Sequence, residues 1–190
     1  MLDQKKTNVT GDGNKIVSGD DNSTTTNHFH YKKETKLSVL FRSLKEKFEL
    51  NETVNNFSED LARFKISRDI VGLEKKLEDA NMAHHIVSFE FLKQEYYKKL
   101  TKYQFFEPAQ EIHSFLLAVV YEKFRNLVYP MIRENASEKD ILRAISTEIV
   151  EPILSIINEE GCDDIMGLSA IEIEGMIHYL TGQCHLKWTL

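Results

Sequence analysis

The sequence predicts an all-α protein, a bundle-like domain of six or seven helices with a short N-terminal β-repeat leader. Two observations lead to this prediction. From residue 34 onward, apolar side chains recur at the three- and four-residue steps of amphipathic helices. Before that point the chain is rich in Gly, Asp, Asn and Thr and repeats a short motif. We therefore divide the chain into a leader, residues 1–33, and a helical domain, residues 34–190, which is long enough to hold one hydrophobic core.

The leader repeats one pattern at a spacing of eight residues: residues 9–14 read VTGDGN and residues 17–22 read VSGDDN. Gly, Asp and Asn favour turns, while the KIV segment that follows the first motif is typical of a strand. Two strand-and-turn repeats leave the edges of their strands exposed. We therefore expect the repeats of several chains to stack on one another and cover these edges. A disordered leader is the alternative, because this composition buries little apolar surface. The expected oligomerisation residues are Val9, Asn14, Ile16, Val17 and Asn22.

Four apolar stripes open the helical domain. They cover residues 37–48, 54–64, 66–77 and 85–103 in succession. Each stripe keeps the helical period and predicts an amphipathic helix with one face in the core. Ser58 and Ser67 could both cap a helix start, which leaves the boundaries between residues 50 and 80 open.

The most regular helix follows Pro108. Its apolar residues keep the helical pattern from Ile112 until Pro130, so we expect this helix to end there and to form the centre of the core. Ser137 opens the next helix, which Pro152 is expected to kink. The residues expected to face the core from these two helices include Phe115, Leu127, Leu142, Ile145, Ile149, Ile153 and Ile156.

The last helix begins with a capping box formed by Ser169 and Glu172 and ends at Gly182. After it, Cys184, Leu186 and Trp188 are expected to lie on one side of an extended tail, because alternate residues of an extended chain face the same way. Because a tryptophan near a chain end is ordered only where it packs on something, we expect this part to be structural or to face a partner. The residues assigned to this role are Met176, Ile177, Leu186 and Trp188.

The acidic residues are concentrated in residues 106–190. This part carries six Lys and Arg against fourteen Asp and Glu, a net charge of −8, whereas the whole chain carries −6. An acidic surface repels phosphate groups, so we expect a basic protein partner and no direct contact with nucleic acid. A nucleic-acid-binding helical regulator stays as an alternative, because residues 93–103 interleave lysines with tyrosines. The helical period nevertheless places Tyr96 and Tyr103 on the core stripe.

Few residues have the types and spacing that catalysis or metal binding requires. His178, Cys184 and His185 lie close in sequence, but without the CxxC or HxxxH spacing of zinc sites we expect structural histidines. A small effector enzyme acting through Cys184 and His178 stays as a second alternative, although no nucleophile elbow or oxyanion loop is visible. Neighbouring His84 and His85 cannot face the same way on a helix, so they predict no bidentate site. We therefore expect no catalytic residue, no metal and no cofactor.

The sequence shows no membrane or targeting segment. It contains no run of eighteen apolar residues, and its start, MLDQKKTN, lacks the apolar stretch of a signal peptide. It therefore predicts a cytoplasmic protein without a membrane partner. Cys162 and Cys184 lack CxxC spacing and are expected to be buried reduced thiols.

Residues 171–188, IEIEGMIHYLTGQCHLKW, resemble the terminal helix and tail of C-terminal domains in effector components of bacterial ABC-three-component conflict systems, the group that includes Lamassu-type phage defence. The leader is similar to short Gly/Asn repeats that precede domains in several bacterial conflict proteins. The resemblance implies an SMC-like ABC ATPase and a small middle subunit as partners. It also implies an effector enzyme before the C-terminal domain, where this sequence has only the leader. We therefore expect a non-enzymatic docking and assembly module that multimerises through its leader.

Overall fold

The computed structural model describes residues 34–66, 71–160 and 164–189, and every regular element in these ranges is helical. The predicted all-α fold is therefore confirmed for this part of the chain. Residues 34–190 form one structural unit. The leader lies outside the described residues, and with it the predicted oligomerisation residues Val9, Asn14, Ile16, Val17 and Asn22.

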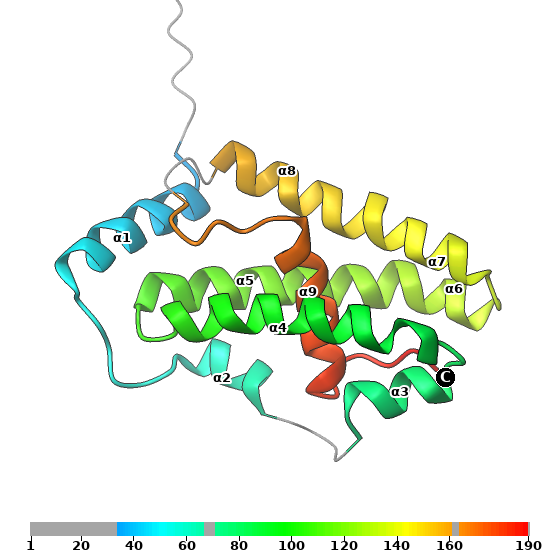
Figure 1. Ribbon diagram of the computed structural model, residues 1–190. Helices are drawn as coiled ribbons and strands as arrows, with labels where there is room; N and C mark the ends of the chain where they lie inside the picture. Colours follow the sequence, from blue (N-terminus) through cyan, green and yellow to red (C-terminus); the bar gives the residue numbers. More distant parts are fainter. Residues whose placement is uncertain (1–33, 67–70, 161–163, 190) are drawn as a thin grey trace, which may run out of the picture. The chain divides into compact units, whose positions relative to one another are not determined.

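The helices follow one another with short connections. In order, they are α1 (Lys36–Leu50), α2 (Glu59–Lys65), α3 (Leu73–Asp79), the 3-10 turn η1 (Ala83–His85), α4 (Ile86–Tyr103), α5 (Glu107–Lys123), the π-helical turn η2 (Phe124–Val128), α6 (Tyr129–Arg133), α7 (Glu138–Ala144), the π-helical turn η3 (Ile145–Val150), α8 (Glu151–Glu160) and α9 (Ala170–Gly182). Because η2 and η3 each join two α-helices without a break, the described ranges contain seven continuous helical rods, in line with the prediction (Figure 1). None of the described helices is both long and apolar enough to span a lipid bilayer.

Several predicted helix starts have the expected cap. Ser58 and Ser137 each accept a hydrogen bond from the amide three residues later. Ser169 and Glu172 form the predicted reciprocal capping box before α9, and this helix ends at Gly182. These caps satisfy amides that have no partner inside the helix, so they set the boundaries locally.

The second helix is shorter than its apolar stripe predicted. α2 begins at Glu59, so Val54 and Phe57 lie in the loop before it. The Val54 amide donates to the Phe105 carbonyl at 2.7 Å, and the Phe57 ring stacks on the Phe105 ring at 6.0 Å. This loop therefore packs on the turn between α4 and α5 without being helical itself.

The two prolines expected to interrupt helices lie just after π-helical turns instead. η2 precedes Pro130 and η3 precedes Pro152. The helix after Pro108 consequently continues through η2 into α6 and ends at Arg133, so the prediction that it ends at Pro130 is wrong. Proline lacks an amide donor and crowds the preceding turn, and a wider turn with shifted hydrogen bonds can accommodate it within a continuous rod.

Helix α5 lies at the centre of the core, as predicted. Figure 1 shows α4 and α5 side by side, with α9 crossing them. Helices α1 and α2 also pack on α5, and η3 and α8 contact α9. The core hydrophobic residues buried along the central rod are Ala109, Ile112, Leu116, Leu117, Val120, Phe124 and Val128. This arrangement leaves the outer faces of α1, α5 and α8 around a shared groove.

Candidate functional site

An apolar groove of about 340 Å³ opens between α1, α5 and α8. Its lining residues are Thr35, Lys36, Leu37, Leu40, Glu111, Phe115, Ile156 and Glu160, and we call it the α1–α5–α8 groove. Phe115 is 48% exposed and Ile156 is 41% exposed. Large apolar side chains gathered on a surface are typical of sites where another molecule binds.

Phe115 and Ile156 were both expected to face the core, and the structure corrects this. On the rod formed by α7, η3 and α8, the buried isoleucines follow steps of four residues, from Ile149 to Ile153 to Ile157. A π-helical turn holds more residues than an α-helical one. After such a turn, the residues that face the core come later in the sequence than a continuous α-helical period predicts. Ile157 therefore takes the core position that the α-helical period assigned to Ile156.

Polar and acidic groups border the groove. Lys36 Nζ lies 3.0 Å from a Glu111 carboxylate oxygen, in an exposed ion pair. The Thr35 hydroxyl donates to Glu160 at 2.8 Å, which ties the start of α1 to the end of α8. Helix α8 carries three glutamates and neither lysine nor arginine. The groove thus combines apolar side chains with the carboxylates of Glu111 and Glu160 at its border.

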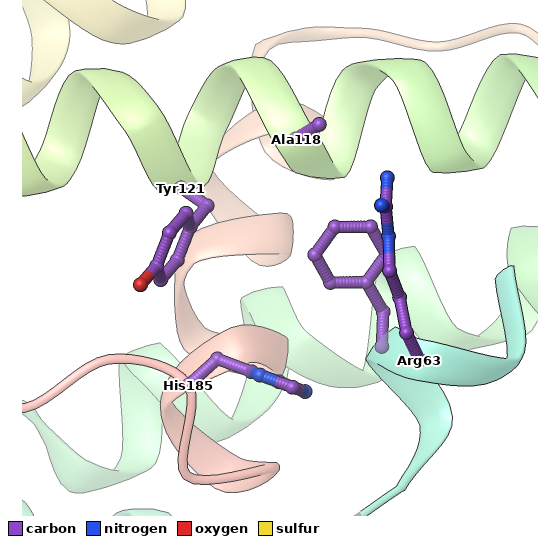
Figure 2. Close-up of a pocket in the computed structure, with 5 residues that line it drawn as sticks. Arg63, Ala118, Tyr121 and His185 are labelled. Carbon is purple, nitrogen blue, oxygen red and sulfur yellow. The ribbon is translucent and has the colours of Figure 1, made fainter. Parts of the chain in front are cut away.

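A smaller pocket of about 260 Å³ lies between α2, α5 and the tail, lined by Arg63, Phe64, Ala118, Tyr121 and His185 (Figure 2). The Arg63 guanidinium lies 4.9 Å from the centre of the Phe64 ring, and this ring meets the His185 ring edge-on at 5.7 Å. Arg63 also lies 3.6 Å from Asp60. Because this carboxylate already offsets the positive charge, the pocket is a poor anion site.

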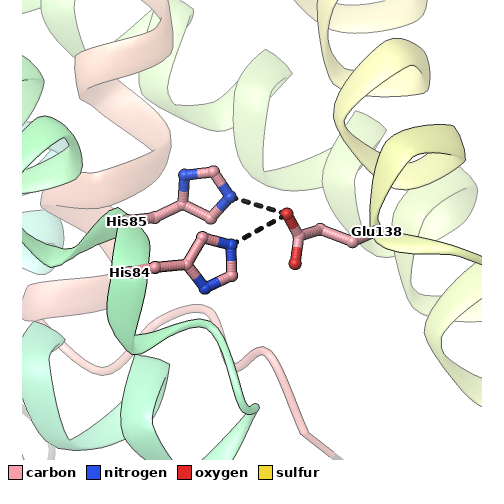
Figure 3. Close-up of side chains that lie close together, drawn as sticks. All are labelled: His84, His85 and Glu138. Atoms are coloured by element: carbon pink, nitrogen blue, oxygen red, sulfur yellow. Dashed lines mark hydrogen bonds and ion pairs between the residues drawn. The ribbon is translucent and has the colours of Figure 1, made fainter.

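His84, His85 and Glu138 form a side-chain cluster that the sequence did not predict (Figure 3). The two Nε2 atoms lie 3.0 and 2.8 Å from the same Glu138 oxygen, Oε1. The expectation that the histidines cannot face the same way is therefore wrong. They lie in the 3-10 turn η1, before α4 begins, and their ring centres are 4.2 Å apart, so both side chains reach the same carboxylate oxygen.

The hydrogen bonds in this cluster favour the ionised carboxylate of Glu138. Hydrogen bonds from His85 and His84 lower the pKa of Glu138 below its ordinary value. The His85 ring stacks parallel to Phe89, with ring centres 4.8 Å apart, and Phe89 in turn stacks on His178 at 3.9 Å. His178 is 1% exposed, and burial lowers its pKa. An aromatic column thus leads from the exposed cluster into the core.

A family model for C-terminal domain 9 (CTD9) of the ABC-three component (ABC-3C) systems matches residues 72–188. The chain belongs to this family. The resemblance seen in residues 171–188 is therefore confirmed, and the matched segment of more than half the chain extends from just before α3 to Trp188. No curated protein and no solved structure matched the chain.

The four residues assigned to the end of the CTD9 segment are all buried: Met176, Ile177, Leu186 and Trp188. The Trp188 ring packs on Phe89 and edge-on against Phe124, with centres 5.7 and 5.3 Å apart. Its indole N–H donates to the Thr181 hydroxyl at 3.2 Å. In this domain these side chains pack the tail onto α9 and the core.

The lysine-rich face of α4 in the CTD9 domain is engaged within the domain. Lys93 and Lys98 pair with the glutamates three residues before them. Lys99 donates to the Met166 carbonyl at 2.7 Å, and the Lys102 ammonium lies 4.8 Å from the centre of the Tyr103 ring. Tyr96 and Tyr103 are buried on the core stripe, as predicted.

The two residues of the enzyme alternative lie in different surroundings. His178 stacks inside the CTD9 core, whereas Cys184 Sγ donates to the Val71 carbonyl at 3.1 Å. A substrate therefore has no direct access to the His178 ring, which a nucleophile and base pair would require.

The sequence holds a weak signal for the groove and none for the cluster. Apolar residues cover more than one face of α5, which is typical of a helix with a second contact surface. Glu138, by contrast, is 53 residues away from His85, and no local spacing connects them.

Proposed function

We propose that this CTD9 protein is a non-enzymatic docking and assembly module of a bacterial ABC-3C conflict system that acts against phage. The helical domain docks to the complex of an SMC-like ABC ATPase and its small middle subunit, and the leader multimerises the module. The observation that carries the docking proposal is the α1–α5–α8 groove, with Phe115 and Ile156 half exposed in it.

The groove suits an amphipathic helix with basic residues beside its apolar face. Such helices place apolar side chains at helical spacing into a groove, where Phe115 and Ile156 would contact them. Glu160 of α8 and Glu111 would meet the basic flank, and charges of opposite sign speed association and select the partner. We therefore assign the groove to a basic helix of the ATPase complex.

The alternatives have less support. The lysines of α4 pair with carboxylates, a carbonyl or aromatic rings of the same domain, which leaves few cations to neutralise phosphate. The burial of His178 argues against an enzyme that uses it with Cys184. A docking role requires neither unpaired lysines on α4 nor an accessible pair of His178 and Cys184.

Copurification of the ATPase and middle subunit with the full chain tests this proposal. We expect Phe115→Asp and Ile156→Asp each to weaken binding by about thirtyfold, from a loss of roughly 2 kcal/mol per apolar anchor. The same variants should lose protection in a phage plaque assay. Added salt should weaken binding by the unaltered chain, because the proposed rim contacts are electrostatic.

Val87→Asp is the matched control, since Val87 is 83% exposed on α4 and lies outside the groove. It introduces the same charge at an apolar surface position and should bind normally. Thermal melting of all three variants checks that the domain remains folded. If the folded Phe115→Asp and Ile156→Asp variants both bound like the parent chain, the groove would not be the docking site.

A further inference from the structure

We propose that His84, His85 and Glu138 form a binding site for a divalent transition-metal ion of the zinc type. This inference goes beyond the proposed docking function and shares no residue with the α1–α5–α8 groove. It also reverses the expectation that the chain holds no metal. The cluster is the one group of three or more such donor residues found among the described residues.

The donor atoms are already close together. One ligand atom from each residue lies within 4.8 Å of the other two, and both Nε2 atoms point to Glu138 Oε1 (Figure 3). Zinc bonds of about 2.0–2.2 Å in a tetrahedron place ligand atoms about 3.3–3.5 Å apart. The present separations of 3.0 and 2.8 Å therefore need to widen by only about half an ångström.

The surrounding structure orients these ligands. Both imidazoles extend from the turn η1 toward Glu138, with ring centres 4.2 Å apart (Figure 3). The parallel Phe89 ring supports the His85 ring. Glu138 is the first residue of α7, whose start is held by the Ser137 cap. Metal ligands bind best when their orientation is set by such supporting contacts.

The ligand types select the class of ion. Two imidazoles and one carboxylate suit zinc, whereas magnesium and calcium prefer oxygen ligands. Glu138 also lines a hollow of about 440 Å³ together with Asp79 and Asn135. The His84 side chain is exposed, so solvent can supply a water molecule as a fourth ligand.

Binding of the ion would change the protonation of the cluster. A metal ion takes the Nε2 lone pairs, so each neutral imidazole then carries its proton on Nδ1 and no longer donates to Glu138. Protons compete with the ion for the Nε2 atoms, so zinc affinity should fall in acid. The ion would also join η1 to α7, which are separated by more than 50 residues in sequence, and should stabilise the folded domain.

Calorimetric titration of the full chain with ZnCl₂, after removal of metal by a chelator, tests the site. We expect binding in which His84→Ala and Glu138→Ala each weaken affinity by about tenfold or more, and a rise in Tm with zinc that both variants lose. MgCl₂ should produce neither effect. Glu134→Gln, a change at an exposed carboxylate near α7, should bind zinc as the parent chain does.

Two results would overturn the proposal. Zinc that does not bind the parent chain would leave the cluster as an ordinary ion pair between histidine and Glu138. Zinc that binds equally well to the His84→Ala and Glu138→Ala variants would belong to other residues. Because these substitutions leave the groove unchanged, partner copurification with the same variants separates failure of the metal site from failure of the docking function.

Discussion

Gly175 determines how closely α9 approaches α4. A Cβ atom at this position would lie 2.3 Å from the Leu92 carbonyl oxygen and 2.8 Å from Tyr96 Cβ. Neither atom can move without moving the backbone or a buried ring. The two helices can cross at this distance only because residue 175 has no side chain.

Gly175→Ala is therefore expected to lower the free energy of unfolding by about 1–3 kcal/mol, because it overpacks the crossing. Urea unfolding measures the loss. Gly182→Ala is the control in the same helix, since its Cβ would meet only the flexible end of Lys93, at 3.1 Å. Equal stability of the two variants would contradict the role assigned to the crossing.

His113 makes stability depend on pH. It is fully buried on α5, and burial lowers its pKa from 6.5 to about 3. The unfolded chain takes up a proton below pH 6.5, whereas the folded chain does not until about pH 3. The contribution of neutral His113 to stability is thus complete above pH 6.5 and is lost as the pH falls toward 3.

We expect His113→Gln to change this pH dependence. Between pH 7 and pH 5, the unfolding free energy of the parent chain should fall by about 2 kcal/mol relative to the variant. Urea unfolding at the two pH values provides the measurement. Tyr96→Phe removes the hydroxyl that lies 3.4 Å from His113 Nδ1 but keeps the imidazole. The unfolding free energy of Tyr96→Phe should depend on pH as that of the parent chain does. If the difference in unfolding free energy between the parent chain and His113→Gln were the same at pH 7 and pH 5, the assignment to His113 would be contradicted.

At the scale of the elements, the two π-helical turns change which residues reach the core. The rod α7–η3–α8 buries Ile145, Ile149, Ile153 and Ile157 at equal steps of four residues. A straight α-helix would drift away from this face within three turns. The turn at η3 keeps these isoleucines in the core and leaves Ile156 in the groove.

Trp188 packs the tail after α9 onto the core. We expect Trp188→Ala to lower the unfolding free energy by about 3 kcal/mol, because it removes a buried ring and its contacts with Phe89 and Phe124. Thermal and urea unfolding measure this loss. Trp188→Phe, which keeps an aromatic ring but not the hydrogen bond to Thr181, should cost less. A parent-like Tm for Trp188→Ala would show that the tail contributes little to the fold.

For the whole molecule, we expect the helical domain to fold without the leader. The buried core of the described residues begins at Leu37, so removal of residues 1–33 should leave the unfolding midpoint unchanged. The same deletion should lower the mass measured by light scattering, because the repeat is proposed to hold copies together.

Val9→Asp combined with Val17→Asp is the companion to this deletion in the full-length chain. Repeated charges on a thin β-layer would repel one another, so the mass should fall here as well. If the deletion variant and the double Asp variant both kept the oligomeric mass of the parent chain in light scattering, the alternative of a disordered leader would be favoured. Loss of helical stability after the deletion would instead count against an independent helical domain.

The sequence by itself determined the helical class, the caps at Ser137 and Ser169, the burial of Tyr96 and Tyr103 and the family resemblance of residues 171–188. These features depend on side chains within about four residues of one another along a helix. Only the tertiary structure decided the exposure of Phe115 and Ile156 in the groove and the meeting of His84 and His85 with Glu138. Those outcomes depend on π-helical turns and on packing between elements far apart in the chain, which local periodicity does not encode.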